Sequence, residues 1–142
     1  MERRKFLLGA VVATLAAQTS SSKLTVQVTY NGSGTVDEKR KVFVVLWNTP
    51  IFAKEDSDVR PIDVKGLTSK TGTVEFNKIK KSPVYLSLVY DPAGGWGTMG
   101  PPPSGSSLGL YEKEPGTPAP IDVQPGKIVK VEATFDDSNK MK

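Results

Sequence analysis

Strict alternation of apolar and polar side chains predicts three strands in this chain. It runs through Lys23–Tyr30, Val84–Tyr90 and Ile128–Phe135. Successive strand residues point to opposite faces, so each stretch is typical of a strand with one buried face. The positions expected to face the core are Leu24, Val26, Val28, Tyr30, Val84, Leu86, Leu88, Tyr90, Val129, Val131, Ala133 and Phe135.

Weaker patterns predict four further strands. Val42–Trp47 is a continuous apolar run, too short for a core helix and rich in β-branched and aromatic residues, which favours a central strand. Ile62–Leu67, Thr73–Phe76 and Ile121–Val123 are short apolar stretches between turn residues. About seven short strands without an amphipathic helix predict an all-β antiparallel β-sandwich. We expect one domain over residues 22–137, then a polar tail over 138–142 with the neighbouring Asp136 and Asp137 solvated.

The stretch from Asp91 to Pro120 is predicted to be one long Gly/Pro-rich loop. Loops longer than about 12–15 residues are uncommon in compact domains and tend to be functional or disordered. This one keeps apolar residues, which a disordered linker usually lacks. They either fold back as a lid over an open edge or end of the sandwich, or form a binding platform. In the second interpretation, the binding residues are Asp91, Trp96 and Tyr111.

The N-terminus predicts export from the cytoplasm. Arg3, Arg4, Phe6 and Leu7 resemble the twin-arginine signal of bacteria, and an apolar run to Ala17 follows them. That run is shorter than the roughly 20 residues of a membrane-spanning helix, so we expect no stable membrane anchor after cleavage behind Ala16 or Ala17. A general secretory signal is the alternative. Residues 1–17 are the expected signal peptide, and the protein is expected in the periplasm or outside the cell.

Composition narrows the chemistry that this chain can perform. It contains no Cys and no His, so no disulfide, Ser-His-Asp or Cys-His hydrolysis, or His-ligated metal site can be built. We expect no bound metal and no cofactor. The net charge of +4 comes partly from Arg3, Arg4 and Lys5 of the signal. Without a basic stripe, nucleic-acid binding is not expected.

One segment resembles a known family of domains. Gly72–Phe76, Ile79 and Pro83–Asp91 are similar to the hairpin of transthyretin-like, carboxypeptidase-regulatory-like sandwich domains. Val42–Trp47, with Asn48 and Phe52, also resembles an element of small exported bacterial proteins of unknown function. The resemblance implies a transthyretin-like or immunoglobulin-like β-sandwich and says almost nothing about activity. In the second family an ion-binding loop follows this hairpin, but only Asp91 matches it here.

Two functions of different classes follow from these observations. The first is a non-catalytic, exported β-sandwich module that binds an envelope protein or an envelope glycan through the stretch from Asp91 to Pro120. The second is a small carboxylate-based hydrolase acting on envelope glycans, with Asp91 and either Glu112 or Glu114 as its acid/base pair. We favour the first, because nothing in the spacing shows that these carboxylates meet.

Overall fold

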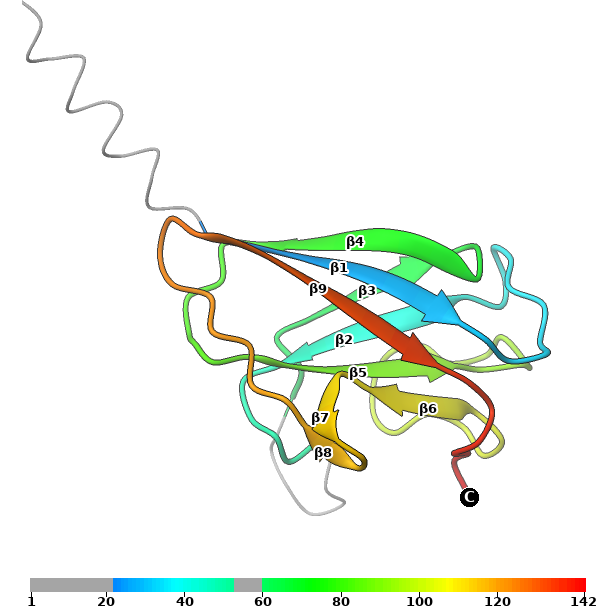
Figure 1. Cartoon of the computed structure of the whole chain (residues 1–142). Coiled ribbons are helices and arrows are strands. Elements are labelled where there is room, and N and C mark those ends of the chain that lie inside the picture. The colour runs from blue at the N-terminus through cyan, green and yellow to red at the C-terminus, as the bar shows by residue number, and fades with distance from the viewer. Residues whose placement is uncertain (1–21, 53–59) are drawn as a thin grey trace, which may run out of the picture.

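The computed structural model describes residues 22–52 and 60–142, and its strands form two main layers (Figure 1). Arg3, Arg4, Phe6 and Leu7 of the expected signal lie outside the described residues. No helix occurs in the described part of the chain, so this part contains no candidate for a membrane-spanning helix. The strands are β1 Lys23–Tyr30, β2 Val42–Trp47, β3 Asp63–Leu67, β4 Thr71–Asn77, β5 Tyr85–Tyr90, β6 Ser107–Leu110, β7 Glu112–Glu114, β8 Thr117–Pro118 and β9 Ile128–Phe135.

The two layers confirm the all-β sandwich. One sheet has the strand order β4-β1-β9 and the other the order β3-β2-β5-β6, with β7 and β8 as a separate hairpin. The strands β1, β2 and β9 have the predicted bounds, while β3, β4 and β5 differ by one or two residues at their ends. Ile121–Val123 is not a strand, because only Ile121 pairs there, in a bridge to Val84.

One strand pair departs from the antiparallel arrangement. β1 runs antiparallel to β4 but parallel to β9, with Val26 opposite Val131. All other strand pairs of the described residues are antiparallel. Parallel neighbours require a long crossover connection, and here the whole second sheet lies between β1 and β9 in the sequence. The first and last strands of the chain, β1 and β9, therefore lie side by side in the same sheet.

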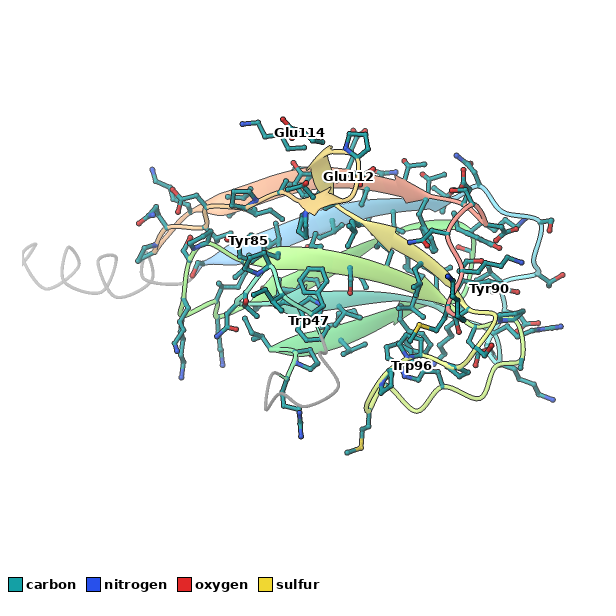
Figure 2. All side chains as sticks on the ribbon, turned by 90° about the horizontal axis from the view of Figure 1, so that it is seen from below. Trp47, Tyr85, Tyr90, Trp96, Glu112 and Glu114 are labelled. Atoms are coloured by element: carbon teal, nitrogen blue, oxygen red, sulfur yellow. The ribbon has the colours of Figure 1, made fainter. Side chains whose placement is uncertain are left out.

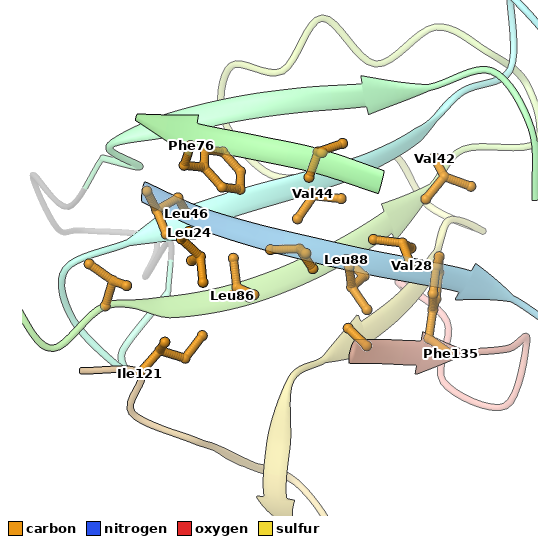
Figure 3. Packing of buried hydrophobic residues seen from close by; sticks show 14 of the residues in the cluster. Leu24, Val28, Val42, Val44, Leu46, Phe76, Leu86, Leu88, Ile121 and Phe135 are labelled. Carbon is orange, nitrogen blue, oxygen red and sulfur yellow. The ribbon is translucent and has the colours of Figure 1, made fainter. Parts of the chain in front are cut away.

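The core lies between the two sheets (Figure 3). The alternating residues of β1 and β5 point into it, and so does every second residue of β2. At one end Tyr30 and Tyr90 stack with ring centroids 4.7 Å apart, and Phe135 packs 5.0 Å from Tyr30. Gly109 of β6 lies against Phe135, where an added Cβ would come within 2.3 Å of the Phe135 side chain. The absence of a side chain lets the two sheets approach there.

The stretch from Asp91 to Pro120 is not one long loop, which corrects the prediction. It contains β6, β7 and β8, and β6 extends the second sheet by pairing with β5. Gly109 interrupts the apolar pattern of β6, and all three residues of β7 are exposed. Neither strand therefore has the alternation from which strands are predicted.

The C-terminal residues also belong to the fold. The Asn139 carbonyl accepts a hydrogen bond from Leu108 N–H, and Met141 exchanges backbone hydrogen bonds with Gly105 and Ser106, all at 2.8 Å. These bonds cover the edge of β6 that faces away from β5. The expected polar tail is therefore tied to the second sheet.

Candidate functional site

The second sheet is apolar on both of its faces. In β2, Val42, Val44 and Leu46 point into the core, whereas Phe43, Val45 and Trp47 point away from it. This explains why the strand lacks alternation in the sequence, since a strand that is covered on both sides reads as a continuous apolar run. We call the resulting surface the outer aromatic face. Its members are Phe43, Val45, Trp47, Phe52, Val64, Tyr85, Val89, Trp96 and Leu108.

Aromatic rings pack on this face in two pairs. Trp96 meets Phe43 edge to face, with ring centroids 5.2 Å apart and planes at 86°. Phe52 stacks on Trp47 at 4.9 Å and 23°. Both arrangements are favoured by the ring quadrupole and contribute about 0.5–1.5 kcal/mol each beyond the area they bury. Figure 2 looks onto this side of the molecule and shows Trp47, Tyr85 and Trp96 spread across it.

The face has a buried centre and a half-exposed rim of rings. Val45, Val89 and Trp47 retain 2%, 3% and 6% of their exposure. The rings of Phe43, Phe52, Tyr85 and Trp96 are only half-buried. They therefore pack against the sheet and keep part of their surface exposed. The Trp47 indole N–H donates to Ser87 Oγ at 2.9 Å, which satisfies the one polar atom of that buried ring.

Asp91 positions Trp96 on this face. Its carboxylate accepts hydrogen bonds from the backbone N–H groups of Ala93 at 2.9 Å, Gly95 at 2.8 Å and Trp96 at 2.9 Å. The side chain is 2% exposed, so its acceptor capacity is spent inside the protein. Asp91 is thus a positioning residue for the loop that carries Trp96, and a ligand would not reach its carboxylate.

The structure does not bring Trp96 and Tyr111 together. Trp96 lies on the outer aromatic face, whereas Tyr111 packs half-buried against the core between the sheets. Leu108 also lies on the outer face. Trp96, Leu108 and Tyr111 therefore pack on two different sides of the sandwich, whereas Met99 of the same stretch is 88% exposed. A platform made jointly by Trp96 and Tyr111 does not form.

The carboxylates of the hydrolase hypothesis are also separated. Asp91 follows Tyr90, which pairs with Ser107, whereas Glu112 follows the end of β6 at Leu110, which pairs with Ser87. At about 3.3 Å per residue, the ends of this ladder alone are about 10 Å apart, and both carboxylates lie beyond them. Glycosidase carboxyl groups lie about 5–9.5 Å apart.

The hairpin glutamates lie away from the outer aromatic face. Figure 2 shows Glu112 and Glu114 at the opposite edge of the molecule from Trp96. Glu112 accepts a hydrogen bond from Gly116 N–H at 2.8 Å within its own hairpin. Within residues 22–52 and 60–142, no three acidic side chains come together as a metal site would require.

Sequence reasoning missed one carboxylate network at the end of the sandwich. Asp137 was expected to be solvated, but it accepts hydrogen bonds from Tyr30 OH at 2.5 Å, Ser107 Oγ at 2.6 Å and Ser33 N–H at 2.9 Å. The bonds from Ser107 and Tyr30 lower the pKa of Asp137 to about 2. Burial, and then the bond to Asp137, raise the pKa of Tyr30 to about 12.

This network is structural. All of its polar atoms are satisfied by one another, and it ties the chain after β9 to β1 and β6. A local sequence pattern could not predict this network, because Tyr30 and Asp137 are 107 positions apart.

Comparison of the chain with protein-family models, with curated proteins and with solved structures finds no match. The functional argument therefore rests on the geometry of the outer aromatic face.

Proposed function

We propose that this chain is an exported, non-catalytic β-sandwich module that binds a glycan of the bacterial cell envelope. The observation that carries the proposal is the outer aromatic face, where half-buried rings stand on a rigid sheet. A sugar ring presents apolar C–H groups on its flat sides and hydroxyl groups around its rim. Flat aromatic rings with one open side provide a matching apolar surface, and they lose little conformational freedom when a ligand binds.

The rings are held in place before a ligand arrives. Asp91 fixes the backbone of Trp96 through its hydrogen bonds, and Phe43 supports the indole from the side. Phe52 is likewise supported by Trp47. Ordering of side chains at an interface costs about 0.5–1.5 kcal/mol for each mobile group, and this cost is small where neighbours already fix the ring. Prior ordering favours a binding function for the face.

The non-catalytic part of the proposal rests on the available functional groups. The sequence offers no His or Cys as general base, nucleophile or metal ligand. Asp91 is occupied by backbone N–H groups, and Glu112 and Glu114 lie on the far hairpin. The carboxylates that the hydrolase alternative requires, Asp91 with Glu112 or Glu114, are therefore poorly placed to act as an acid/base pair.

The export part of the proposal rests on the sequence. The Arg3-Arg4 motif and the short apolar run after it predict delivery to the periplasm or beyond. The resemblance to transthyretin-like domains is compatible with a binding role, and such a fold by itself specifies no ligand.

Co-sedimentation with purified insoluble peptidoglycan tests the proposal. We expect the protein to sediment with the glycan, and Trp96→Ala and Phe43→Ala to weaken binding about tenfold each, because such rings contribute more than about 1 kcal/mol at a contact centre. Gln27→Ala, an exposed position on the other sheet, is the matched control and should bind normally. Binding that survives both ring substitutions would contradict the role of the face. If the wild-type protein stays in solution but crosslinks to an envelope protein through this face, the ligand class is wrong.

A further inference from the structure

The strand β9 leaves one of its edges without a partner strand. It is the outermost strand of its sheet, with β1 on its inner side (Figure 1). Over residues 22–52 and 60–142, no strand pairs with its other side. By contrast, the outer edge of β6 is covered by hydrogen bonds from the C-terminal residues. An open edge of this length is a template for another strand unless the protein blocks it, and β9 contains no Pro and no bulge.

Backbone hydrogen bonds at the two ends of β9 show which of its residues face the open edge. The carbonyl of Lys127 accepts from Lys23 N–H at 3.0 Å, and that of Phe135 accepts from Asn31 N–H at 2.8 Å. Both odd-numbered residues therefore direct their backbone groups toward β1. The N–H and C=O of successive strand residues alternate between the two sides. The backbone groups of Ile128, Lys130, Glu132 and Thr134 consequently point outward.

We propose that this edge pairs with the same edge of a second copy of the chain. In an antiparallel, two-fold symmetric pair, outward-pointing residues must lie opposite outward-pointing residues. That condition leaves three registers that overlap well, centred on Lys130, Val131 or Glu132. Centring on Lys130 places two lysines opposite each other, and centring on Glu132 does the same with two glutamates. Only the register centred on Val131 is free of like-charge contacts.

The register centred on Val131 is complementary along the strand. Lys130 of each copy lies opposite Glu132 of the other, and directly opposed opposite charges stabilise a strand pair by roughly 0.2–1 kcal/mol. Val131 meets its own symmetry mate at the axis, on the side that faces the core. Val129 and Val131 are only half-buried in the single chain, although both are apolar and point inward. Ile128, which is 70% exposed, would lie opposite Thr134.

The pairing would join the two three-stranded sheets into one continuous sheet across the axis. It leaves the outer aromatic face free, because that face belongs to the other sheet. Each dimer would then carry two copies of the face, so that a polymeric glycan could engage both at once and gain avidity. The dimer itself does not depend on the identity of the ligand.

Sedimentation velocity of the purified protein with a set of charge variants tests the pairing. The wild-type protein should sediment with twice the mass of a single mature chain. Lys130→Glu and Glu132→Lys each create like charges across the axis, so each should convert the dimer to a monomer. The combined variant Lys130→Glu/Glu132→Lys reverses both pairs and should restore the dimer. Both side chains are exposed in the single chain, so the variants are expected to fold, which circular dichroism would verify.

Several results would overturn the proposal. The proposal is wrong if the wild-type protein remains monomeric at about 100 µM, because a specific dimer with a Kd near 1 µM would be almost fully formed at that concentration. A dimer that withstands both single substitutions uses another surface. A double variant that stays monomeric would show that Lys130 and Glu132 do not face each other. Thr73→Lys, at an exposed position of β4 on the far side of the same sheet, is the control and should leave the mass unchanged.

Discussion

The two sheets of the sandwich present outer faces of opposite character. On the three-stranded sheet, Thr25, Gln27, Thr73, Lys130 and Glu132 surround a shallow hollow. On the four-stranded sheet, the equivalent positions of β2 and β5 are mostly apolar, and aromatic rings cover them. The first face resembles any solvated sheet surface. The second requires a cover, which the chain supplies in part through Phe52, Trp96 and Leu108.

This difference is visible in the sequence once the sheets are known. β1 and β9 alternate because one face of each is wet, whereas β2 does not alternate because both of its faces are covered. A continuous apolar strand in an antiparallel sandwich therefore marks a sheet whose outer face is also covered, here in part by Phe52, Trp96 and Leu108 of the same chain.

The largest expected effect comes from placing a charge on each face in turn. Val45→Lys puts an ammonium group at a position that is 2% exposed on the outer aromatic face, and should lower the free energy of unfolding by about 3 kcal/mol or more. Gln27→Lys makes the same change in charge on the wet face and should alter it by less than about 0.5 kcal/mol. Urea unfolding followed by tryptophan fluorescence measures both. Equal losses would mean that the two faces do not differ.

The next effect concerns the residue that positions Trp96. Asp91→Ala removes the acceptor for three backbone N–H groups in a buried place, and should cost about 2 kcal/mol of stability. It should also shift tryptophan emission to longer wavelength as Trp96 leaves Phe43. Asp136→Ala is the matched control, since Asp136 bonds only to exposed Ser138 at 2.9 Å. Unchanged emission in Asp91→Ala would show that Trp96 does not depend on Asp91.

The smallest expected effect is a pH dependence at Asp137, which holds Ser107 at the start of β6. Folding lowers the pKa of Asp137 from 3.8 to about 2. Its carboxylate therefore stabilises the fold above about pH 4, and that contribution is lost as the pH falls toward about 2. For a partly exposed group we expect about 1 kcal/mol.

Asp137→Asn tests this effect by urea unfolding across that pH range. The variant should be less stable than the wild type at neutral pH, and the difference should shrink as the pH falls. A constant difference down to about pH 2 would mean that the charge of Asp137 contributes nothing.

The strands with regular patterns could be predicted, and those that depend on distant partners could not. Three strands were predicted with their observed bounds, because alternation or a dense apolar run identifies them: Lys23–Tyr30, Val42–Trp47 and Ile128–Phe135. β6 was missed, since its stability comes from β5 on one side and the C-terminal residues on the other. The parallel pairing of β1 with β9 leaves no local trace either.

The candidate site was predicted in fragments. Trp96 was expected to bind and lies on the outer aromatic face, but its expected companion Tyr111 lies against the core. The ring that Trp96 does contact, Phe43, belongs to β2, which was expected to be a central strand and is one. A sequence pattern shows that a strand is covered on both faces, but only the packing shows which rings are left half-open.

The most direct test of the central claim is an NMR titration of the protein with a soluble peptidoglycan oligosaccharide. If the four-stranded sheet provides the binding surface, the largest shift changes should occur at the indole N–H of Trp96 and at the amides of β2 and β5. The amides of Thr25, Gln27 and Thr73 should not move. Shifts concentrated on the three-stranded sheet, or no shifts at all up to millimolar oligosaccharide, would contradict the account.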